Sequence, residues 1–219
     1  MSDTFSTGDY FSNQADAYAT YRPSYPAEMA AWIVQHLPRR ELAWECGCGS
    51  GQATKIFAPH FQRIVASDLS QSQLSQAPAL PNVVWQQTPA EKSLLPNHCV
   101  DFIFVAQAFH WFEPTAFWQE VNRVLRTDGW IAIMSYGKCR IDNVAVDRIC
   151  HDLYENVLGP YWPPERRLVE EGYASIDFPF SRVSSPPFQI VCSWTLEQLL
   201  GYFESWSATQ RYIQDNSIS

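Results

Sequence analysis

The sequence lacks a long basic run and a long apolar run, and each absence excludes a class of partner. Its 219 residues carry a net charge of −8 with a pI near 5.0, and no basic run is longer than Arg39-Arg40 or Arg166-Arg167. Because nucleic acid is a polyanion that needs a basic surface, we expect no nucleic-acid partner. No apolar stretch approaches the ~20 residues of a membrane-spanning helix, so we expect no membrane partner.

The sequence also lacks the cysteine pattern of a zinc site and the pattern of a secretory signal. Cys46-Gly-Cys48 has no second pair at zinc-ligand spacing, so we expect no metal. The first residues, MSDTFSTGDYF, do not place an apolar segment after a basic one, which predicts a cytoplasmic protein. In that setting the six cysteines should be free thiols.

Apolar residues are abundant and aromatic residues are unusually so. Apolar residues make up 46% of the chain and aromatic residues 15%, including nine Trp. A chain of this length and composition suits a single domain with a complete core. The aromatic residues predict a thick aromatic core, and a deep apolar pocket is the alternative.

The stretch LAWECGCGSGQA, residues 42–53, is the most informative one. A short apolar run ends at Glu45, and Gly47, Gly49 and Gly51 then alternate with other residues before a helix-compatible segment. Glycine tolerates positive φ and lets a ligand approach the backbone, and the amides that open the next helix can bind it. A second apolar run ends at Ser67-Asp68. A glycine-rich turn after one strand and an acid after the next is typical of a site for a nucleoside-bearing cofactor.

Apolar runs alternate with helical patterns through the first two thirds of the chain. This order predicts a doubly wound, Rossmann-like α/β fold with a mostly parallel sheet. Expected strands are residues 42–45, 63–67, 82–86, 100–106 and 130–135, and expected helices are 27–37, 52–58, 70–77 and 114–126. Pro26 is expected to open the first helix with Ser24 as its cap.

The pattern changes after Tyr136. We expect a helix over residues 142–158, then a proline-rich lid over the ligand crevice, with a surface loop as the alternative. A sixth strand over 188–194 and a helix that starts at a Thr195–Gln198 capping box complete the prediction. Residues 1–219 therefore form one domain: a cover and first helix (1–38), a cofactor-binding core (39–137), a lid (138–187) and a last strand and helix (188–219).

The glycine spacing distinguishes between two kinds of cofactor. Nicotinamide and flavin enzymes usually have G-x-G-x-x-G, in which the helix end packs closely beneath a pyrophosphate. Here the spacing is G-x-G-x-G with Glu45 ahead of it. An acid would repel a pyrophosphate but suits S-adenosylmethionine, which carries an amine and a sulfonium cation. These residues favour S-adenosylmethionine, and a nicotinamide oxidoreductase is a distant alternative.

At these residues the sequence resembles class I S-adenosylmethionine-dependent methyltransferases, of the methyltransferase type 11 group. E-x-G-x-G-x-G matches their first motif and Ser67-Asp68 the second, while residues 88–91 match the turn beside the adenine and residues 123–129 a later helix and turn. More narrowly, the chain looks like the trans-aconitate methyltransferase-like group. The stretches that carry this likeness are YATYRPSYP, VAQAFHWF, LGPYW and ESWSA.

The resemblance implies a seven-stranded type of sheet and a role for each matching residue. Asp68 would accept hydrogen bonds from both ribose hydroxyls, since a carboxylate can bind two donors. The remaining implied cofactor contacts are Leu69, Ala90 and Glu91 at the adenine, Glu45, Gly47, Cys48 and Gly49 at the methionine moiety, Gln107 at the transfer channel, and Tyr18 and Arg22 as a cover. For Arg22, a surface salt bridge is the alternative.

The chain departs from the family pattern in two places. Thr127-Asp128-Gly129 stands where the family commonly has Pro-Gly-Gly, and the sequence stops at Ser219 where the family continues to a final antiparallel strand. Without that strand the fifth strand would expose an edge, which a dimer could cover. The alternative function is therefore a non-catalytic or partner-dependent module, or a truncated form, that binds the cofactor or S-adenosylhomocysteine.

The methyl acceptor is expected to be a small molecule, in particular a carboxylate of the trans-aconitate type. Such an acceptor is already anionic and needs no base, whereas a hydroxyl or carbon acid would need one. His110 is the candidate base or orienting group, with an aromatic-packed wall residue as the alternative. Trp111 beside it, and Arg166 and Arg167 beneath the lid, are the candidate acceptor contacts, although paired arginines on a loop are more often only solvated.

Overall fold

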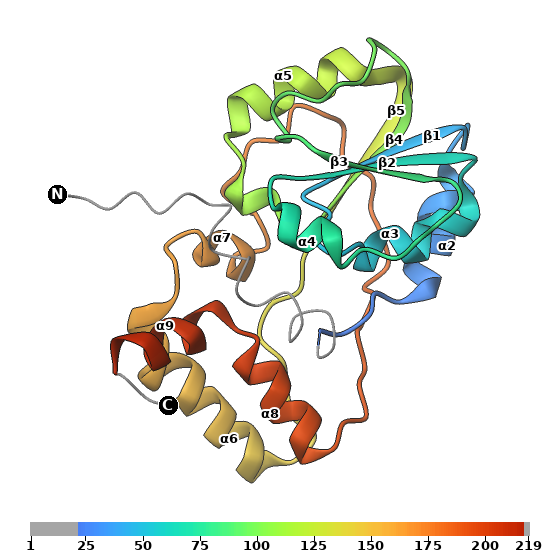
Figure 1. Ribbon diagram of the computed structural model, residues 1–219. Coiled ribbons are helices and arrows are strands. Elements are labelled where there is room, and N and C mark those ends of the chain that lie inside the picture. The colour runs from blue at the N-terminus through green and yellow to red at the C-terminus, as the bar shows by residue number, and fades with distance from the viewer. Residues whose placement is uncertain (1–21, 217–219) are drawn as a thin grey trace, which may run out of the picture.

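A five-stranded parallel sheet forms the centre of the upper part of the molecule (Figure 1). The computed structural model describes residues 22–216. The sheet order is β3-β2-β1-β4-β5, and every neighbouring pair is parallel. The strands are β1 (Leu42–Cys46), β2 (Arg63–Asp68), β3 (Val83–Gln87), β4 (Val100–Ala106) and β5 (Leu125–Met134). The predicted doubly wound α/β fold is confirmed.

The chain reverses direction across the sheet between β1 and β4. After β1 it builds β2 and β3 on one side, then crosses to β4 and β5 on the other. β4 is buried along almost its whole length, as expected of a central parallel strand covered on both faces. Ligands of open α/β sheets bind outside the carboxyl ends of the strands at such a switch point. This topology therefore places the glycine turn after β1 and Gln107 after β4 on either side of one crevice.

β5 begins five residues earlier than predicted. It pairs with β4 at Leu125, and its register then shifts so that Trp130 pairs with Phe102. The predicted turn at Asp128-Gly129 is thus an irregularity inside the strand. The preceding helix α5 (Pro114–Val124) ends two residues earlier than predicted, because Leu125 already has an extended backbone.

Helices cover both faces of the sheet. On one face lie α2 (Ala27–His36), α3 (Gln52–Phe57) and η2 (Ala58–His60), and Phe57 packs between Phe102 and Phe104 of β4 at centroid distances of 5.4 and 4.6 Å. On the other face α5 packs through Phe117, Val121 and Val124. The predicted Ser24 cap is wrong: Pro26 occupies the N-cap position of α2, and no side chain caps it. The short helix α4 (Gln71–Ser75) follows β2 and is capped by Ser70.

The carboxyl-terminal third forms a second, helical layer below the sheet (Figure 1). Its elements are α6 (Val144–Asp152), the π-helical η4 (Leu153–Val157), η5 (Gly159–Tyr161), α7 (Arg166–Glu170), α8 (Leu196–Glu204) and α9 (Ser207–Asp215). Tyr154, Tyr202 and Trp206 are buried at its centre. The predicted capping box of Thr195 and Gln198 is confirmed, but the helix behind it breaks at Ser205-Trp206 into α8 and α9.

The predicted sixth strand at residues 188–194 is wrong. Phe188 and Ile190 pack against the core, where the ring of Phe188 lies 6.1 Å from that of Trp32, while Gln189 and Val191 are exposed. One-sided packing thus accounts for the alternating pattern, and the segment joins no β-ladder. In the described residues β5 lies at the edge of the sheet, as expected for a chain without the family's final strand.

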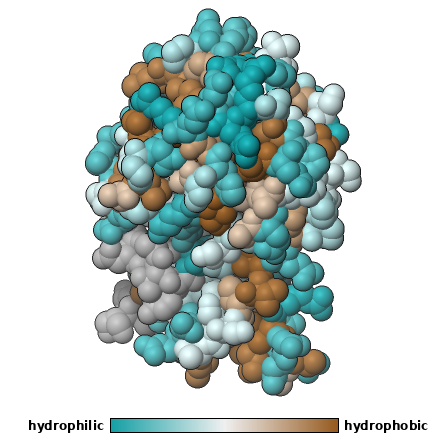
Figure 2. Space-filling view, turned by 90° about the vertical axis from the view of Figure 1, so that its right-hand side faces the viewer, coloured by the Kyte–Doolittle hydropathy of each residue, from teal (hydrophilic) through white to brown (hydrophobic). Residues whose placement is uncertain are grey.

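The surface mixes apolar and polar side chains over both parts of the molecule on the face shown in Figure 2. Exposed apolar side chains of the helical layer include Val144 and Ile149 on α6 and Leu196 and Leu200 on α8. Within residues 22–216, no helix combines the length and apolarity needed to cross a membrane.

We expect Asp101 to be the polar residue on which the sheet depends most. Its buried carboxylate accepts hydrogen bonds from the amides of Glu41 and Leu42 and pairs with Arg126 at 2.8 Å. Asp101→Ala leaves two amides without their acceptor and should lower the free energy of unfolding by about 3 kcal/mol. Urea denaturation measures this loss. In the control Asp128→Ala, which removes only the exposed pair with Arg39, the loss should stay below about 1 kcal/mol; equal losses would contradict the assignment.

Candidate functional site

The glycine turn after β1 has a backbone that only glycine adopts easily. Gly47 has a φ of +67° and Gly51 a φ of +81°. A Cβ on Gly47 would lie 2.5 Å from the Cβ of Ala108, and one on Gly51 would lie 2.4 Å from Cη2 of Trp85. The turn therefore needs glycine for its left-handed backbone. It also needs glycine for close packing against Ala108 after β4 and Trp85 of β3.

Asp68 at the end of β2 holds the glycine turn in place. One oxygen of its carboxylate accepts from the amide of Gly49, and the other accepts from the amide of Ser70, both at 2.8 Å. The amide of Cys48 donates to the carbonyl of Ser67, which ties the same turn to β2. Burial raises the pKa of Asp68, and the amide hydrogen bonds oppose that shift. Each oxygen retains a second lone pair for a ligand hydroxyl.

Glu45 forms the buried floor of the site. Its side chain is fully enclosed, accepts a hydrogen bond from the hydroxyl of Thr54 on α3, and lies near Asp68. Burial is the main cause that raises the pKa of Glu45 to about 8, and the charge of Asp68 adds to it. A cation placed beside this carboxyl would favour its ionised form.

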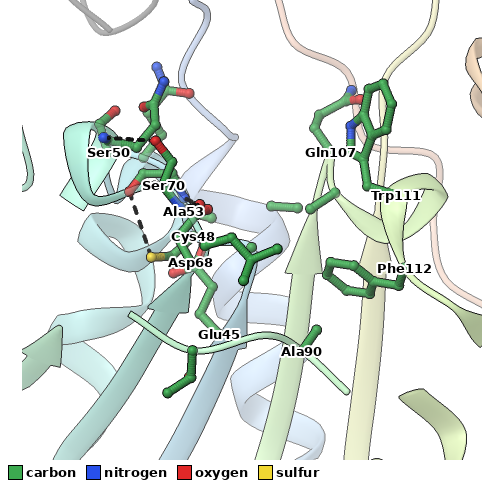
Figure 3. Close-up of a pocket in the computed structure, with 18 of the residues that line it drawn as sticks. Glu45, Cys48, Ser50, Ala53, Asp68, Ser70, Ala90, Gln107, Trp111 and Phe112 are labelled. Atoms are coloured by element: carbon green, nitrogen blue, oxygen red, sulfur yellow. Dashed lines mark hydrogen bonds between the residues drawn. The ribbon is translucent and has the colours of Figure 1, made fainter. Parts of the chain in front are cut away.

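One cavity brings ten of the predicted residues together (Figure 3). We call it the glycine-loop cavity, and its predicted lining residues are Glu45, Gly47, Cys48, Gly49, Asp68, Leu69, Ala90, Glu91, Gln107 and Trp111. Asp68 and Cys48 face Gln107, Trp111 and Phe112 across the opening. Leu69 is half exposed at the rim, so its apolar surface is open to a ligand. Glu91 accepts from the amide of Glu113 and so braces the turn after β3 against α5.

Gln107 separates this cavity from a second one. Its φ of +55° is unusual for a residue with a side chain, and such backbone strain is concentrated at functional sites. The amide nitrogen of its side chain donates to the carbonyl of Tyr136 at 2.8 Å, which fixes its direction. Gln107 and Trp111 line both cavities, so a molecule in the second lies next to a molecule in the first.

The second cavity is aromatic and cationic. We call it the aromatic cavity; it is lined by Arg22, Gln107, His110, Trp111, Tyr136, Gly137, Lys138, Tyr154, Trp162, Pro163, Arg166, Tyr202, Trp206 and Ser207. Three of these side chains are cations and none is a carboxylate. A cavity with such a lining favours a small anionic guest.

His110 lies in the wall of the aromatic cavity on the short helix η3 (Phe109–Trp111). Its Nδ1 is 3.1 Å from the hydroxyl of Tyr173, and its ring lies beside that of Trp111. Burial, reinforced by the positive charge of Arg166, lowers the pKa of His110 to about 4. The imidazole is therefore neutral at pH 7.

The two predicted arginines of the lid have different positions. Arg166 lines the aromatic cavity and lies over the ring of Trp162 at 5.2 Å. Arg167 does not line it: its side chain is 76% exposed and pairs with Glu171 on the surface of α7. The structure brings Arg166 but not Arg167 to this cavity, because successive residues of a helix point in different directions. Arg22 also lines the aromatic cavity, where its Nη2 donates to the carbonyl of Ser205. Tyr18 lies outside the described residues.

Sequence reasoning missed much of both walls. In the glycine-loop cavity it missed Ser70, Gln73 and Phe112, and in the aromatic cavity Lys138, Tyr154, Trp162, Tyr202 and Trp206. The ESWSA and LGPYW stretches contain two of these, Trp206 and Trp162, but their meeting depends on the tertiary fold. All six cysteines are free, and the described residues hold no cluster of three or more His, Cys, Asp or Glu side chains suited to a metal.

The fold and the site together define a class of protein. A glycine turn after β1, an acid after β2 and an adjoining cavity at the switch point form a site for a nucleoside-bearing cofactor beside a second substrate. The residues present fit the parts of S-adenosylmethionine. The half-exposed Leu69 suits its apolar adenine, the Asp68 carboxylate its ribose hydroxyls and the buried Glu45 its cationic end, while the glycines leave the backbone of the turn open to it.

Comparison with known proteins gives the family. The family described as "Methyltransferase domain" matches residues 44–133. A Dictyostelium discoideum protein named as a methyltransferase is 34% identical over 94% of this chain and 80% of its own. A Saccharomyces cerevisiae protein named as an S-adenosylmethionine-dependent methyltransferase is 26% identical over 91% and 80% of the two chains. The solved structure of an Anaeromyxobacter dehalogenans protein, titled a type II methyltransferase, has a TM-score of 0.83 and 39% identity over 90% and 83%. The chain belongs to the class I S-adenosylmethionine-dependent methyltransferases, and its cofactor is S-adenosylmethionine.

We expect Gly47→Ala to damage the cofactor site more than Gly49→Ala. Both substitutions strain a left-handed backbone by ~1–2 kcal/mol, but only the Cβ at position 47 also collides with Ala108. At Gly49 the nearest atom would be 3.7 Å away. Calorimetry with S-adenosylhomocysteine should show the larger loss of affinity for Gly47→Ala, and thermal unfolding the larger loss of stability. Equal losses in both variants would contradict the close-packing account.

We expect Glu45 to make stability fall as the pH rises. Its folded pKa of about 8 lies above its unfolded value, so between pH 5 and pH 8 the native state holds a proton that the unfolded chain has lost. At about 1.4 kcal/mol per pKa unit, this costs on the order of 4 kcal/mol across that window. Urea unfolding of the wild type and of Glu45→Gln at several pH values isolates the effect. The difference between the two should change with pH; a constant difference would contradict the assignment.

Proposed function

We propose that this methyltransferase transfers its methyl group to a small carboxylic acid of the trans-aconitate type. The single observation that carries this proposal is the aromatic cavity, which adjoins the cofactor cavity at Gln107 and Trp111 and is lined by Arg22, Lys138 and Arg166. Three cations and no carboxylate among the described lining residues suit an acidic acceptor, with Glu155 and Glu170 holding Lys138 and Arg166 as ion pairs from outside that lining. A likeness to the trans-aconitate methyltransferase-like group in the YATYRPSYP and LGPYW stretches supports the same acceptor class.

In this proposal the residues of the glycine-loop cavity hold the cofactor. Asp68 would accept from the ribose hydroxyls, Leu69, Ala90 and Glu91 would surround the adenine, and Gly47, Cys48 and Gly49 would approach the methionine moiety through their backbones; all of them line the cavity. The positive charge of the ammonium group would favour the ionised form of Glu45. Bound S-adenosylmethionine supplies a methyl carbon already activated by its sulfonium. The protein then has to align the acceptor and exclude water, and alignment by itself contributes ~7–11 kcal/mol to lowering a barrier.

Arg166 is the main acceptor contact in this proposal, and Trp111 is the wall that guides the acceptor toward Gln107. The guanidinium presents a planar set of donors that matches a carboxylate better than a lysine ammonium does. Its side chain is only 18% exposed, so its attraction for an anion is weakly screened by solvent. Arg22 and Lys138 add positive charge from other sides of the cavity.

His110 orients the acceptor in this proposal and does not need to remove a proton. A carboxylate acceptor is already ionised at neutral pH, and the lowered pKa of His110 keeps its ring uncharged. A neutral imidazole can donate or accept one hydrogen bond at Nε2 while Nδ1 contacts the hydroxyl of Tyr173.

A second candidate function is a module that binds the cofactor without catalysis or acts only with a partner. The edge position of β5 in the described residues favours it, since a second copy or another protein could pair there. A dimer that covers this edge and a cytoplasmic location are further parts of the proposal. The location is supported by six free cysteines.

We expect methyl transfer to trans-aconitate to depend on Arg166 and not on Arg167. Arg166→Gln should raise the acceptor KM at least ~10-fold, because a hydrogen bond to a charged group contributes ~1.5–3 kcal/mol. Transfer of labelled methyl from S-adenosylmethionine measures the KM, and calorimetry should find unchanged affinity for S-adenosylhomocysteine. Arg167→Gln is the matched control, with one like charge removed at an exposed position of the same helix.

Two results would contradict this acceptor. One is an equal loss in the two variants, which would assign the effect to overall charge. The other is cofactor binding without transfer to trans-aconitate or to other acids of a carboxylate panel, which would favour the non-catalytic module.

A further inference from the structure

A π-helical turn contributes Tyr154 to the wall of the aromatic cavity. After α6 ends at Asp152, residues Leu153–Val157 continue in π geometry, and the amide of Leu158 bonds the carbonyl of Leu153, five residues back, at 2.9 Å. π turns are rare, cost helix stability and are concentrated at functional sites. This one changes the direction of its side chains, and Tyr154 is its buried member.

Tyr154 connects the two cations that come from different segments of the cavity wall. Its hydroxyl accepts from Nε of Arg166 at 2.9 Å and donates to Oε1 of Glu170 at 2.5 Å. Nζ of Lys138 lies 4.8 Å and Cζ of Arg166 lies 5.8 Å from the centroid of its ring. Burial raises the pKa of Tyr154 well above its usual value, so the hydroxyl keeps the proton that it donates to Glu170.

The next residue of the π turn acts on the second cation. Glu155 forms an ion pair and hydrogen bond with Lys138, and this bond is the first cause of the lowered pKa of Glu155. Lys138 comes from the chain after β5 and Arg166 from α7, so neither segment by itself determines where the two charges stand. Both charges are anchored on neighbouring residues of one turn.

We propose that Tyr154 is a positioning residue that aims the Arg166 guanidinium and supports the Lys138 ammonium at the acceptor. The inference rests on the carboxylate acceptor proposed above. Because Nε of Arg166 is held by the tyrosine hydroxyl, the outer edge of the guanidinium with its two terminal nitrogens remains for a carboxylate. The packing of Tyr154 against Trp162 and Trp206, at 4.6 and 5.5 Å between centroids, holds the hydroxyl rigidly.

The test is tricarboxylate binding by Tyr154→Phe, which removes the hydroxyl and keeps the ring. Calorimetry on protein loaded with S-adenosylhomocysteine, with trans-aconitate and citrate as probes, should show affinity weakened at least ~10-fold, since a charge-assisted hydrogen bond no longer directs the guanidinium. The affinity for S-adenosylhomocysteine should stay within twofold. The matched control is Tyr161→Phe, whose hydroxyl accepts from Asn216 and does not line the aromatic cavity.

A double-mutant cycle separates positioning from a merely structural role. Arg166→Lys keeps the charge but lacks the Nε–H that Tyr154 binds, so Tyr154→Phe should cause no further loss of tricarboxylate affinity in that background. A structural role would instead lower the melting temperature and cause the same loss in both backgrounds. An equal loss of tricarboxylate affinity in the two backgrounds would overturn the inference, whatever the melting temperature of Tyr154→Phe.

The two proposals fail in distinguishable ways. If the loaded wild type binds neither tricarboxylate, the carboxylate acceptor is wrong, and the role of Tyr154 falls with it. If the wild type binds them and Tyr154→Phe binds them equally well, only the positioning role is overturned.

Discussion

The cofactor site depends on the hydrogen bonds that the Asp68 carboxylate makes to the amides of Gly49 and Ser70. They connect the turn after β1 to the end of β2, so that neighbouring strands present a single surface. The turn can approach β2 this closely because its glycines have no side chains to collide with Ala108 or Trp85. Burial is the main cause of the raised pKa of Glu45, and the charge of the same Asp68 carboxylate adds to it, so the acid that ties the loop also contributes to a floor that suits a cation.

The acceptor side is built differently. Its charged side chains come from three separate places, the segment before α2, the chain after β5, and α7, and they are assembled by the helical layer. That layer has its own aromatic core around Tyr154, Tyr202 and Trp206. A rigid sheet end therefore holds the methyl donor, and an added helical layer determines what is methylated. This division allows acceptor specificity to change without disturbing the cofactor loop.

Most of the fold was predictable because its signals are local. β1 to β4 were located to within one residue at each end, since buried apolar runs bounded by turn residues are strong patterns. Residues 188–194 also have the pattern of a strand, because apolar and polar residues alternate there, yet they pack on the core without joining the sheet. The pattern does not reveal whether a partner strand lies beside the segment. β5 was misplaced at its start because a register shift absorbs the Asp128-Gly129 turn, which a turn signal cannot reveal.

The sequence by itself determined the methyl donor, because the residues that bind it follow consecutive strands, and the parallel sheet aligns their ends. Glu45, the three glycines and Asp68 could thus be read from spacing. Tertiary structure decided the acceptor side, where Arg166 faces the aromatic cavity and its neighbour Arg167 faces solvent. The two residues are of the same type and adjacent in the sequence, so only the packing of α7 against Tyr154 and Trp162 distinguishes them.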